Sequence, residues 1–131
     1  MRKSGIVVLC LCVVGLITAC QQTATITNDD LYGVWINDPG GVYLILDEDG
    51  TYYWTPGATR SNPYDFGEFR VDGTRIIMEG DTDSPNCATY SMTYEVEIVD
   101  EDTLKFTPAV EFKCPDFPPP PDQWTWLRLN P

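Results

Sequence analysis

The side chains of this sequence that could do chemistry are carboxylates and cysteines. The chain of 131 residues holds twenty aspartate and glutamate residues, five cysteines and no histidine. It has no plausible nucleophile beside a base and no glycine-rich phosphate loop, so catalytic triads, histidine-metal centres and nucleotide chemistry lack their parts. We therefore expect a protein that is not an enzyme and that needs no cofactor or metal.

Most of the carboxylates fall in predicted turns. The segment Asp47-Glu48-Asp49-Gly50 suggests a calcium loop, but an EF-hand would need an acid where Ile45 stands and a closing glutamate where Pro56 stands. Because aspartate and glycine favour tight turns, a hairpin turn is the better interpretation of this segment.

A second charged group surrounds Asp65. Asp65 and Glu68 are close in sequence to Arg60 and Arg70. We expect these residues to form solvated ion pairs rather than an acid-base couple.

The N-terminus has the pattern of a targeting segment. Two basic residues precede an apolar run from Ile6 to Ile17, which is too short to span a bilayer and has the length of a secretory signal core. The following Ile17-Thr18-Ala19-Cys20 resembles the lipobox of bacterial lipoproteins. The resemblance implies cleavage before Cys20, a thioether-linked lipid on its sulfur, and an acyl chain such as palmitate on its new amine. An ordinary cleaved signal or an anchor helix with a chance cysteine is the alternative.

These features divide the chain into residues 1–19 as a signal peptide, 20–30 as a tether and 31–131 as one folded domain. Several acyl chains would hold the mature protein at the cell envelope, in the outer membrane or on the outer face of the cell membrane. Removal of the signal takes two of the eight basic residues and none of the twenty acidic ones, which leaves a formal charge of −14. So acidic a surface repels nucleic acid, and we expect no nucleic-acid partner.

The remaining cysteines form an even pair. Cys10 and Cys12 leave with the signal and Cys20 is lipidated, so Cys87 and Cys114 stay in an oxidising compartment and predict a disulfide. A zinc site would lack histidine, and a redox pair would need a Cys-x-x-Cys spacing.

The elements that position these residues are short strands. The helix-capping residues Thr27 to Asp30 predict a single helical turn before the first strand. Alternating apolar patterns and turn residues then predict eight strands. They cover Tyr32–Ile36, Val42–Leu46, Thr51–Thr55, Phe66–Val71, Arg75–Glu79, Tyr90–Ile98, Thr103–Thr107 and Gln123–Leu129.

The sixth strand has the clearest alternation, with one apolar and one polar face. Its predicted inward residues are Tyr90, Met92, Tyr94, Val96 and Ile98. Longer loops are expected at 56–63, at 80–88 and at 108–122, where Pro118–Pro121 predicts an extended polyproline segment.

Eight short antiparallel strands with almost no helix predict an all-β sandwich or closed barrel, and closure removes the sheet edges. The order of four short motifs resembles that of small bacterial lipocalin-like domains of the calycin type. These motifs are Leu31-x-Gly33-x-Trp35, Asp49-Gly50-Thr51-Tyr52, Gly67-x-Phe69-x-Val71-x-Gly73 and Trp124-x-Trp126-x-Arg128. The resemblance implies an up-and-down eight-stranded barrel whose closed end is crossed by Trp35, with Arg128 over it in a cation-π contact.

Aromatic side chains are the candidate binding residues. An eight-stranded barrel is just wide enough for its own side chains or for one small ligand. The aromatic residues expected inside could therefore wall an apolar pocket or fill it. These residues are Tyr52, Trp54, Phe66, Phe69, Tyr94 and Phe106.

The sequence thus leads to a hypothesis of a membrane-anchored lipoprotein with a non-enzymatic binding domain. In its first form the barrel holds a small apolar ligand. In the alternative form the barrel is filled, and its loops act as a protein-interaction or inhibitor module at the cell envelope.

Overall fold

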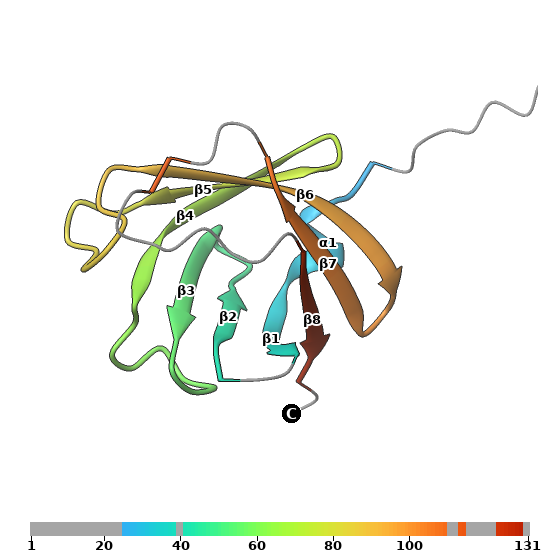
Figure 1. Cartoon of the computed structure of the whole chain (residues 1–131), viewed down its shortest axis with the longest axis horizontal. Helices are drawn as coiled ribbons and strands as arrows, with labels where there is room; N and C mark the ends of the chain where they lie inside the picture. Colours follow the sequence, from blue (N-terminus) through green and yellow to red (C-terminus); the bar gives the residue numbers. More distant parts are fainter. Residues whose placement is uncertain (1–24, 39–40, 110–112, 115–122, 130–131) are drawn as a thin grey trace, which may run out of the picture.

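The computed structural model describes residues 25–38, 41–109, 113–114 and 123–129. The predicted signal peptide, Cys20 and the proline run 118–121 lie outside these residues. The described chain forms one closed antiparallel barrel in which each strand pairs with the next and β8 (Trp124–Arg128) pairs with β1 (Gly33–Asp38) (Figure 1). The predicted all-β, up-and-down, eight-stranded fold is confirmed. No described helix has the length and apolar character needed to cross a membrane.

The other elements follow the order expected from the sequence. A single helical turn, α1 (Asn28–Leu31), precedes the barrel. The remaining strands are β2 (Tyr43–Leu46), β3 (Thr51–Thr55), β4 (Asp65–Asp72), β5 (Arg75–Gly80), β6 (Ser91–Asp100) and β7 (Thr103–Pro108).

Strand alternation places one side-chain set inside the barrel. Its members are almost fully buried, and they come from all eight strands. They include Trp35, Leu44, Leu46, Tyr52, Trp54, Phe69, Ile76, Met78, Met92, Tyr94, Val96, Leu104, Phe106 and Trp126.

The acidic segment between β2 and β3 is a hairpin turn, as predicted. The Gly50 N–H donates to the Asp47 carbonyl at 3.0 Å. The Asp49 carboxylate accepts hydrogen bonds from the Thr51 N–H at 3.0 Å and from its hydroxyl at 2.6 Å. These bonds, first that of the Thr51 hydroxyl, lower the pKa of Asp49 because they stabilise its ionised form.

The inward set predicted for the sixth strand is right in its middle and wrong at its ends. Met92, Tyr94 and Val96 are buried, but Tyr90 is 42% exposed and Ile98 is 40% exposed. Tyr90 precedes the first paired residue of β6, and the register with β7 shifts between Ile98 and Asp100. The alternation therefore continues in the sequence beyond the part of the strand that lines the interior.

The folded region begins before Leu31. The Asp30 carboxylate accepts hydrogen bonds from the N–H and the hydroxyl of Thr27, which caps α1. Ile26 belongs to the hydrophobic core, and its N–H donates to the Gly73 carbonyl at 3.1 Å. Part of the segment assigned to the tether is thus anchored against the turn between β4 and β5.

Candidate functional site

The two ends of the barrel differ in the length of their connections. One end, here called the turn end, carries the short turns at 47–50, 73–74 and 101–102. The opposite end, the loop end, carries the connections at 56–64, 81–90 and 109–123. Binding residues concentrate on longer loops that a rigid scaffold positions, so the loop end and the barrel interior beneath it form the candidate site.

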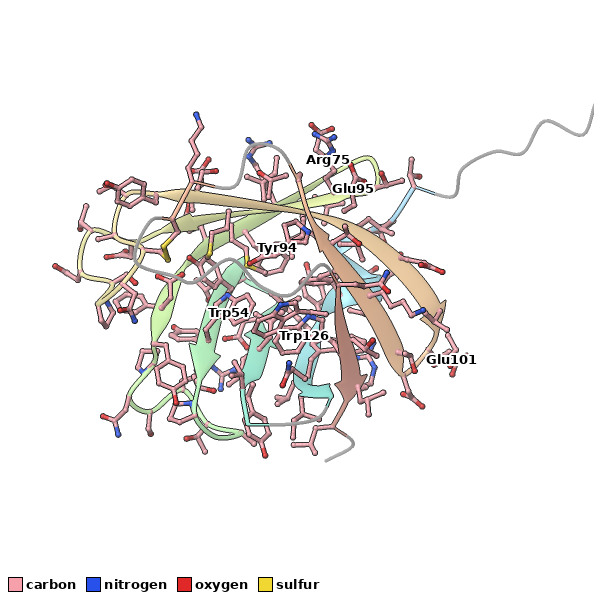
Figure 2. All side chains as sticks on the ribbon, viewed as in Figure 1. Trp54, Arg75, Tyr94, Glu95, Glu101 and Trp126 are labelled. Atoms are coloured by element: carbon pink, nitrogen blue, oxygen red, sulfur yellow. A yellow bond between two sulfur atoms is a disulfide. The ribbon has the colours of Figure 1, made fainter. Side chains whose placement is uncertain are left out.

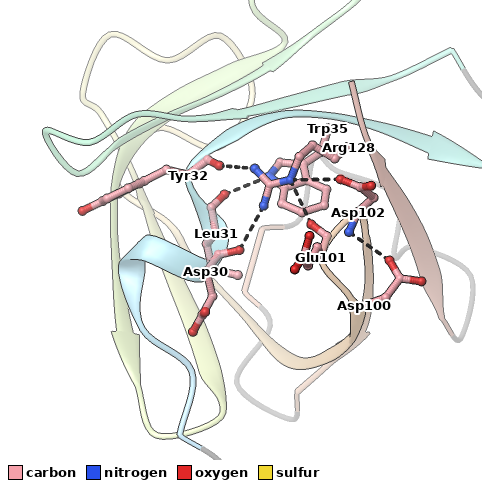
Figure 3. A network of polar contacts seen from close by, with 8 residues as sticks. All are labelled: Asp30, Leu31, Tyr32, Trp35, Asp100, Glu101, Asp102 and Arg128. Atoms are coloured by element: carbon pink, nitrogen blue, oxygen red, sulfur yellow. Dashed lines mark hydrogen bonds and ion pairs between the residues drawn. The ribbon is translucent and has the colours of Figure 1, made fainter. Parts of the chain in front are cut away.

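The turn end is closed by α1 and by the predicted contact between Trp35 and Arg128. The Arg128 guanidinium carbon lies 4.2 Å from the centre of the Trp35 ring. The Trp35 indole N–H donates to the Leu31 carbonyl at 2.8 Å, which ties α1 to β1. Figure 3 shows the tryptophan beneath the guanidinium, with α1 beside both.

Arg128 also bonds to three carbonyls from two parts of the chain. It donates to the carbonyls of Tyr32 at 2.6 Å, Glu101 at 3.0 Å and Asp30 at 3.4 Å. The backbone of Gly33 has a φ of +137°, and a Cβ atom there would lie 2.7 Å from an Arg128 nitrogen. Glycine is therefore required at the start of β1 by both backbone conformation and space. Arg128 has a structural role at this end.

The interior below the loop end is occupied by aromatic rings in mutual contact. The Trp54 ring lies 5.2 Å from Trp126 and 5.6 Å from Trp124, and Tyr94 lies 5.4 Å from Phe106 (centroid distances). These separations are those of packed aromatic pairs. Figure 2 shows Trp54, Tyr94 and Trp126 together inside the barrel, whereas Arg75 and Glu95 lie on its outer surface.

Five of the six predicted interior aromatics are buried in the core, and one is not. Tyr52, Trp54, Tyr94 and Phe106 gather toward the loop end or point to it, and Phe69 contacts Tyr32 edge-on at 6.4 Å. The placement of Phe66 inside was wrong.

Phe66 lies on the outer surface, where its ring stacks on Tyr53 at 6.3 Å. Phe66 and Phe69 are three residues apart on one strand, so alternation sends them to opposite faces. The inward positions of β4 are those of Asp65, Gly67 and Phe69.

Asp65 is the unexpected polar group of the interior. Its carboxylate is fully buried and accepts a hydrogen bond from the Tyr52 hydroxyl at 2.7 Å and another from the Ser84 hydroxyl. The prediction of a solvated ion pair was wrong, because Arg60 pairs with Asp47 instead and Arg70 is exposed on the outer face. A buried carboxylate is costly unless it is hydrogen-bonded, and these two hydroxyls satisfy one oxygen each.

The interior carboxylate affects the neighbouring tyrosines. Burial, and then the charge of Asp65, raise the pKa of the Tyr52 hydroxyl far above its usual range. Burial and Asp65 raise the pKa of Tyr94 in the same way. Both hydroxyls therefore stay protonated at neutral pH, and that of Tyr52 donates to Asp65.

Sequence reasoning missed Asp65 and Ser84 as interior residues. A signal for Asp65 was present, since it alternates with Gly67 and Phe69 along β4. No periodic signal pointed to Ser84, which lies in the loop between β5 and β6 and is brought to Asp65 by the folding of that loop.

The predicted disulfide is present and joins two connections of the loop end. Cys87 and Cys114 are both buried and bonded, and they are 27 positions apart in sequence. A Cβ atom on Gly80 would lie 1.8 Å from the Cys87 carbonyl oxygen, so glycine allows this loop to fold closely against the end of β5. The bond holds the 81–90 loop to the chain that follows β7.

Metal-ligating side chains do not cluster among the described residues. These residues contain no cluster of three or more carboxylate, cysteine or histidine side chains arranged to hold a metal ion. Comparison of the chain with protein families, with curated proteins and with solved structures found no match.

Proposed function

We propose that this protein is a lipid-anchored bacterial envelope protein whose lipocalin-like barrel is a filled, non-enzymatic interaction module. The lipobox resemblance at Cys20 supports the anchor, and the order of the barrel motifs supports the family type. The packing of the interior supports the filled form. Of the two hypotheses drawn from the sequence, the packing favours the protein-interaction module over the apolar-ligand carrier.

The mutual contact of the interior rings is the observation that supports the filled form of the barrel. Trp54, Phe106 and Trp126 are fully buried, and each packs against another ring of the set. Side chains that already satisfy one another leave their ring faces unavailable to an apolar ligand. The loops around them then become the surface offered to a partner.

The anchor would orient this surface. Four residues separate Cys20 from Thr25, and the five residue steps from one to the other span at most about 18 Å when fully extended. Ile26 is bonded to the turn between β4 and β5, at the turn end. A lipid on Cys20 would hold the turn end near the membrane, with the loop end directed away from it.

One observation favours a second candidate, a small ligand that carries hydrogen-bond acceptors. The indole N–H groups of Trp124 and Trp126 are buried and have no acceptor among the described residues. Buried donors usually find a partner, so a carbonyl or carboxylate oxygen entering beside Trp124 would satisfy them.

Native mass spectrometry of residues 21–131, produced in an oxidising compartment, separates the two candidates. The filled module predicts a bare polypeptide that is two hydrogens lighter than the reduced chain. A bound small molecule that disappears on denaturation would overturn the filled form. Cys20→Ser in the full chain tests the anchor, because this variant should leave the membrane fraction; persistence there would contradict the lipid assignment.

A further inference from the structure

The outer surface of the barrel has one apolar wall. Leu129 bonds through its N–H to the Val34 carbonyl at 2.8 Å, and Val34 pairs with Ile45, which pairs with Tyr53 and then Phe66. These residues alternate with interior ones, so their side chains form a continuous outward row over β1 to β4, which Leu129 extends just after β8. A contiguous row of apolar side chains on the solvent side of a barrel is a candidate contact surface.

The opposite wall provides the contrast. Most of its outward positions on β6 and β7 are polar or charged, which is the usual character of a barrel exterior. They include Ser91, Thr93, Glu95, Glu97, Lys105 and Thr107. The exceptions on β6 are Ile98 and Val99, which are exposed near the end of that strand.

The loop between β3 and β4 lies across the apolar row. Arg60 of this loop pairs with Asp47 and lies 5.8 Å from the centre of the Tyr53 ring. Ile45 is consequently almost fully buried although it points outward. The loop covers the middle of the row and leaves the part over β1 open.

Two hollows remain beside the loop and meet at Gly33 and Val34. The smaller, of about 370 Å³, lies between Val34, Ala58 and Leu129. The larger, of about 650 Å³, extends past Ile45 to the acidic turn 47–49. The two adjoining hollows are here together called the β1 groove.

The charged residues around the β1 groove indicate the chemistry of a partner that fits it. Its two cations are already engaged, Arg60 with Asp47 and Arg128 with backbone carbonyls. Glu48 and Asp49 are exposed at one end of the groove, on a chain whose formal charge is −12. An apolar floor with an acidic end is complementary to a segment that carries both aliphatic and basic side chains.

We infer that the β1 groove binds an extended segment of a partner protein in which aliphatic residues alternate with lysine or arginine. This inference rests on the proposed interaction function. It adds to the loop end a second surface, on the outer wall of the barrel beside the 56–64 loop, and assigns that surface a partner chemistry. Aliphatic side chains would enter the two hollows, and a basic side chain would approach Glu48.

The test uses the full chain, lipidated and purified in a nonionic detergent. Two fluorescent peptides serve as probes, Lys-Leu-Lys-Leu-Lys and Glu-Leu-Glu-Leu-Glu, and binding is followed by fluorescence anisotropy at low and high salt. We expect saturable binding of the basic peptide alone, weakened by salt because exposed charges are screened. Equal binding of both peptides, or binding of neither, would overturn the inference.

Matched variants locate the site. Leu129→Ser should weaken binding about threefold to tenfold through lost apolar contact, and Glu48→Gln about twofold to fivefold at low salt. Their controls on β6 are Val99→Ser, at a position 47% exposed compared with 39% for Leu129, and Glu97→Gln. Equal weakening by the control variants would place the peptide elsewhere and refute the groove.

Other occupants give distinct results. A dimer of the full chain that Leu129→Ser dissociates, seen by analytical ultracentrifugation, would assign the groove to a second copy and overturn the inference. Binding of the Cys20→Ser chain to phosphatidylcholine vesicles that Leu129→Ser abolishes would assign the groove to lipid, with the same consequence.

Native mass spectrometry of the same samples reports on the filled barrel separately. A lipidated chain that carries no further small molecule and binds no peptide refutes the groove alone, whereas a co-purified small molecule that disappears on denaturation refutes the filled module.

Discussion

The buried Asp65 carboxylate makes Tyr52→Phe the most informative single change. The substitution keeps the packed ring and removes the hydroxyl that donates to Asp65 at 2.7 Å. A hydrogen bond to a charged group contributes about 1.5 to 3 kcal/mol to the free energy of unfolding. In the variant, the fully buried carboxylate would keep one hydrogen-bond donor among the described residues, the Ser84 hydroxyl. For a domain of this size the expected fall in melting temperature is about 6 to 20 °C.

The assay is urea unfolding of the Cys20→Ser chain, followed by tryptophan fluorescence at neutral pH. Tyr53→Phe is the matched control, because Tyr53 is the next residue on the same strand and points outward. The double variant Tyr52→Phe with Asp65→Asn measures the coupling directly. A loss of stability no larger than that of Tyr53→Phe, or a coupling free energy below about 0.5 kcal/mol, would refute the view that this hydroxyl stabilises a charged Asp65.

Three further predictions follow from the described contacts. The pKa values of Tyr52 and Tyr94 are raised in the folded state, so above about pH 10 the unfolded chain loses protons that the folded chain keeps. As the pH rises above about 10, the free energy of unfolding should then fall by up to about 1.4 kcal/mol per pH unit for each tyrosine. In a plot of the urea midpoint against pH, Tyr94→Phe should make this fall less steep. Reduction of the Cys87–Cys114 disulfide, which closes a loop of 27 residues, should lower the free energy of unfolding by about 3 to 4 kcal/mol. Urea unfolding with and without reductant measures this difference, and an unchanged midpoint would contradict the prediction. Arg128→Lys should lower the free energy of unfolding by about 1 to 3 kcal/mol, because lysine cannot bond two separate carbonyls while stacking on an indole. Thermal unfolding measures the loss, and a variant as stable as the original chain would exclude the structural role of Arg128 at the turn end.

The strand order was predictable because hairpin patterns are local. Turn residues such as Asp49-Gly50 and Asp72-Gly73 separate alternating runs, and a chain of hairpins forms an up-and-down sheet. The disulfide could also be predicted, since Cys87 and Cys114 remain as an even pair once the cysteines of the predicted signal and the predicted lipidation site are set aside. The contact of Arg128 with Trp35 came from the order of the motifs, and the structure contains it.

The interior was harder to predict, because alternation tells which residues share a face but not where a strand leaves the barrel. Tyr90 and Ile98 continue the pattern of β6, yet both are exposed beyond the lined portion of that strand. Phe66 was placed inside for its aromatic character, although its neighbour at the next position, Gly67, shares the inward face with Phe69.

By itself, the sequence determined the eight strands, their order, the disulfide pair and the strong negative charge, since each depends on composition or on neighbours in the chain. Only the tertiary structure decided that Asp65 is enclosed and held by Tyr52 and Ser84, residues 13 and 19 positions away. It also decided that the loop carrying Arg60 folds over Tyr53 and leaves the β1 groove open. Whether a polar side chain meets water or a partner depends on which distant segments fold over it, and no local pattern encodes that.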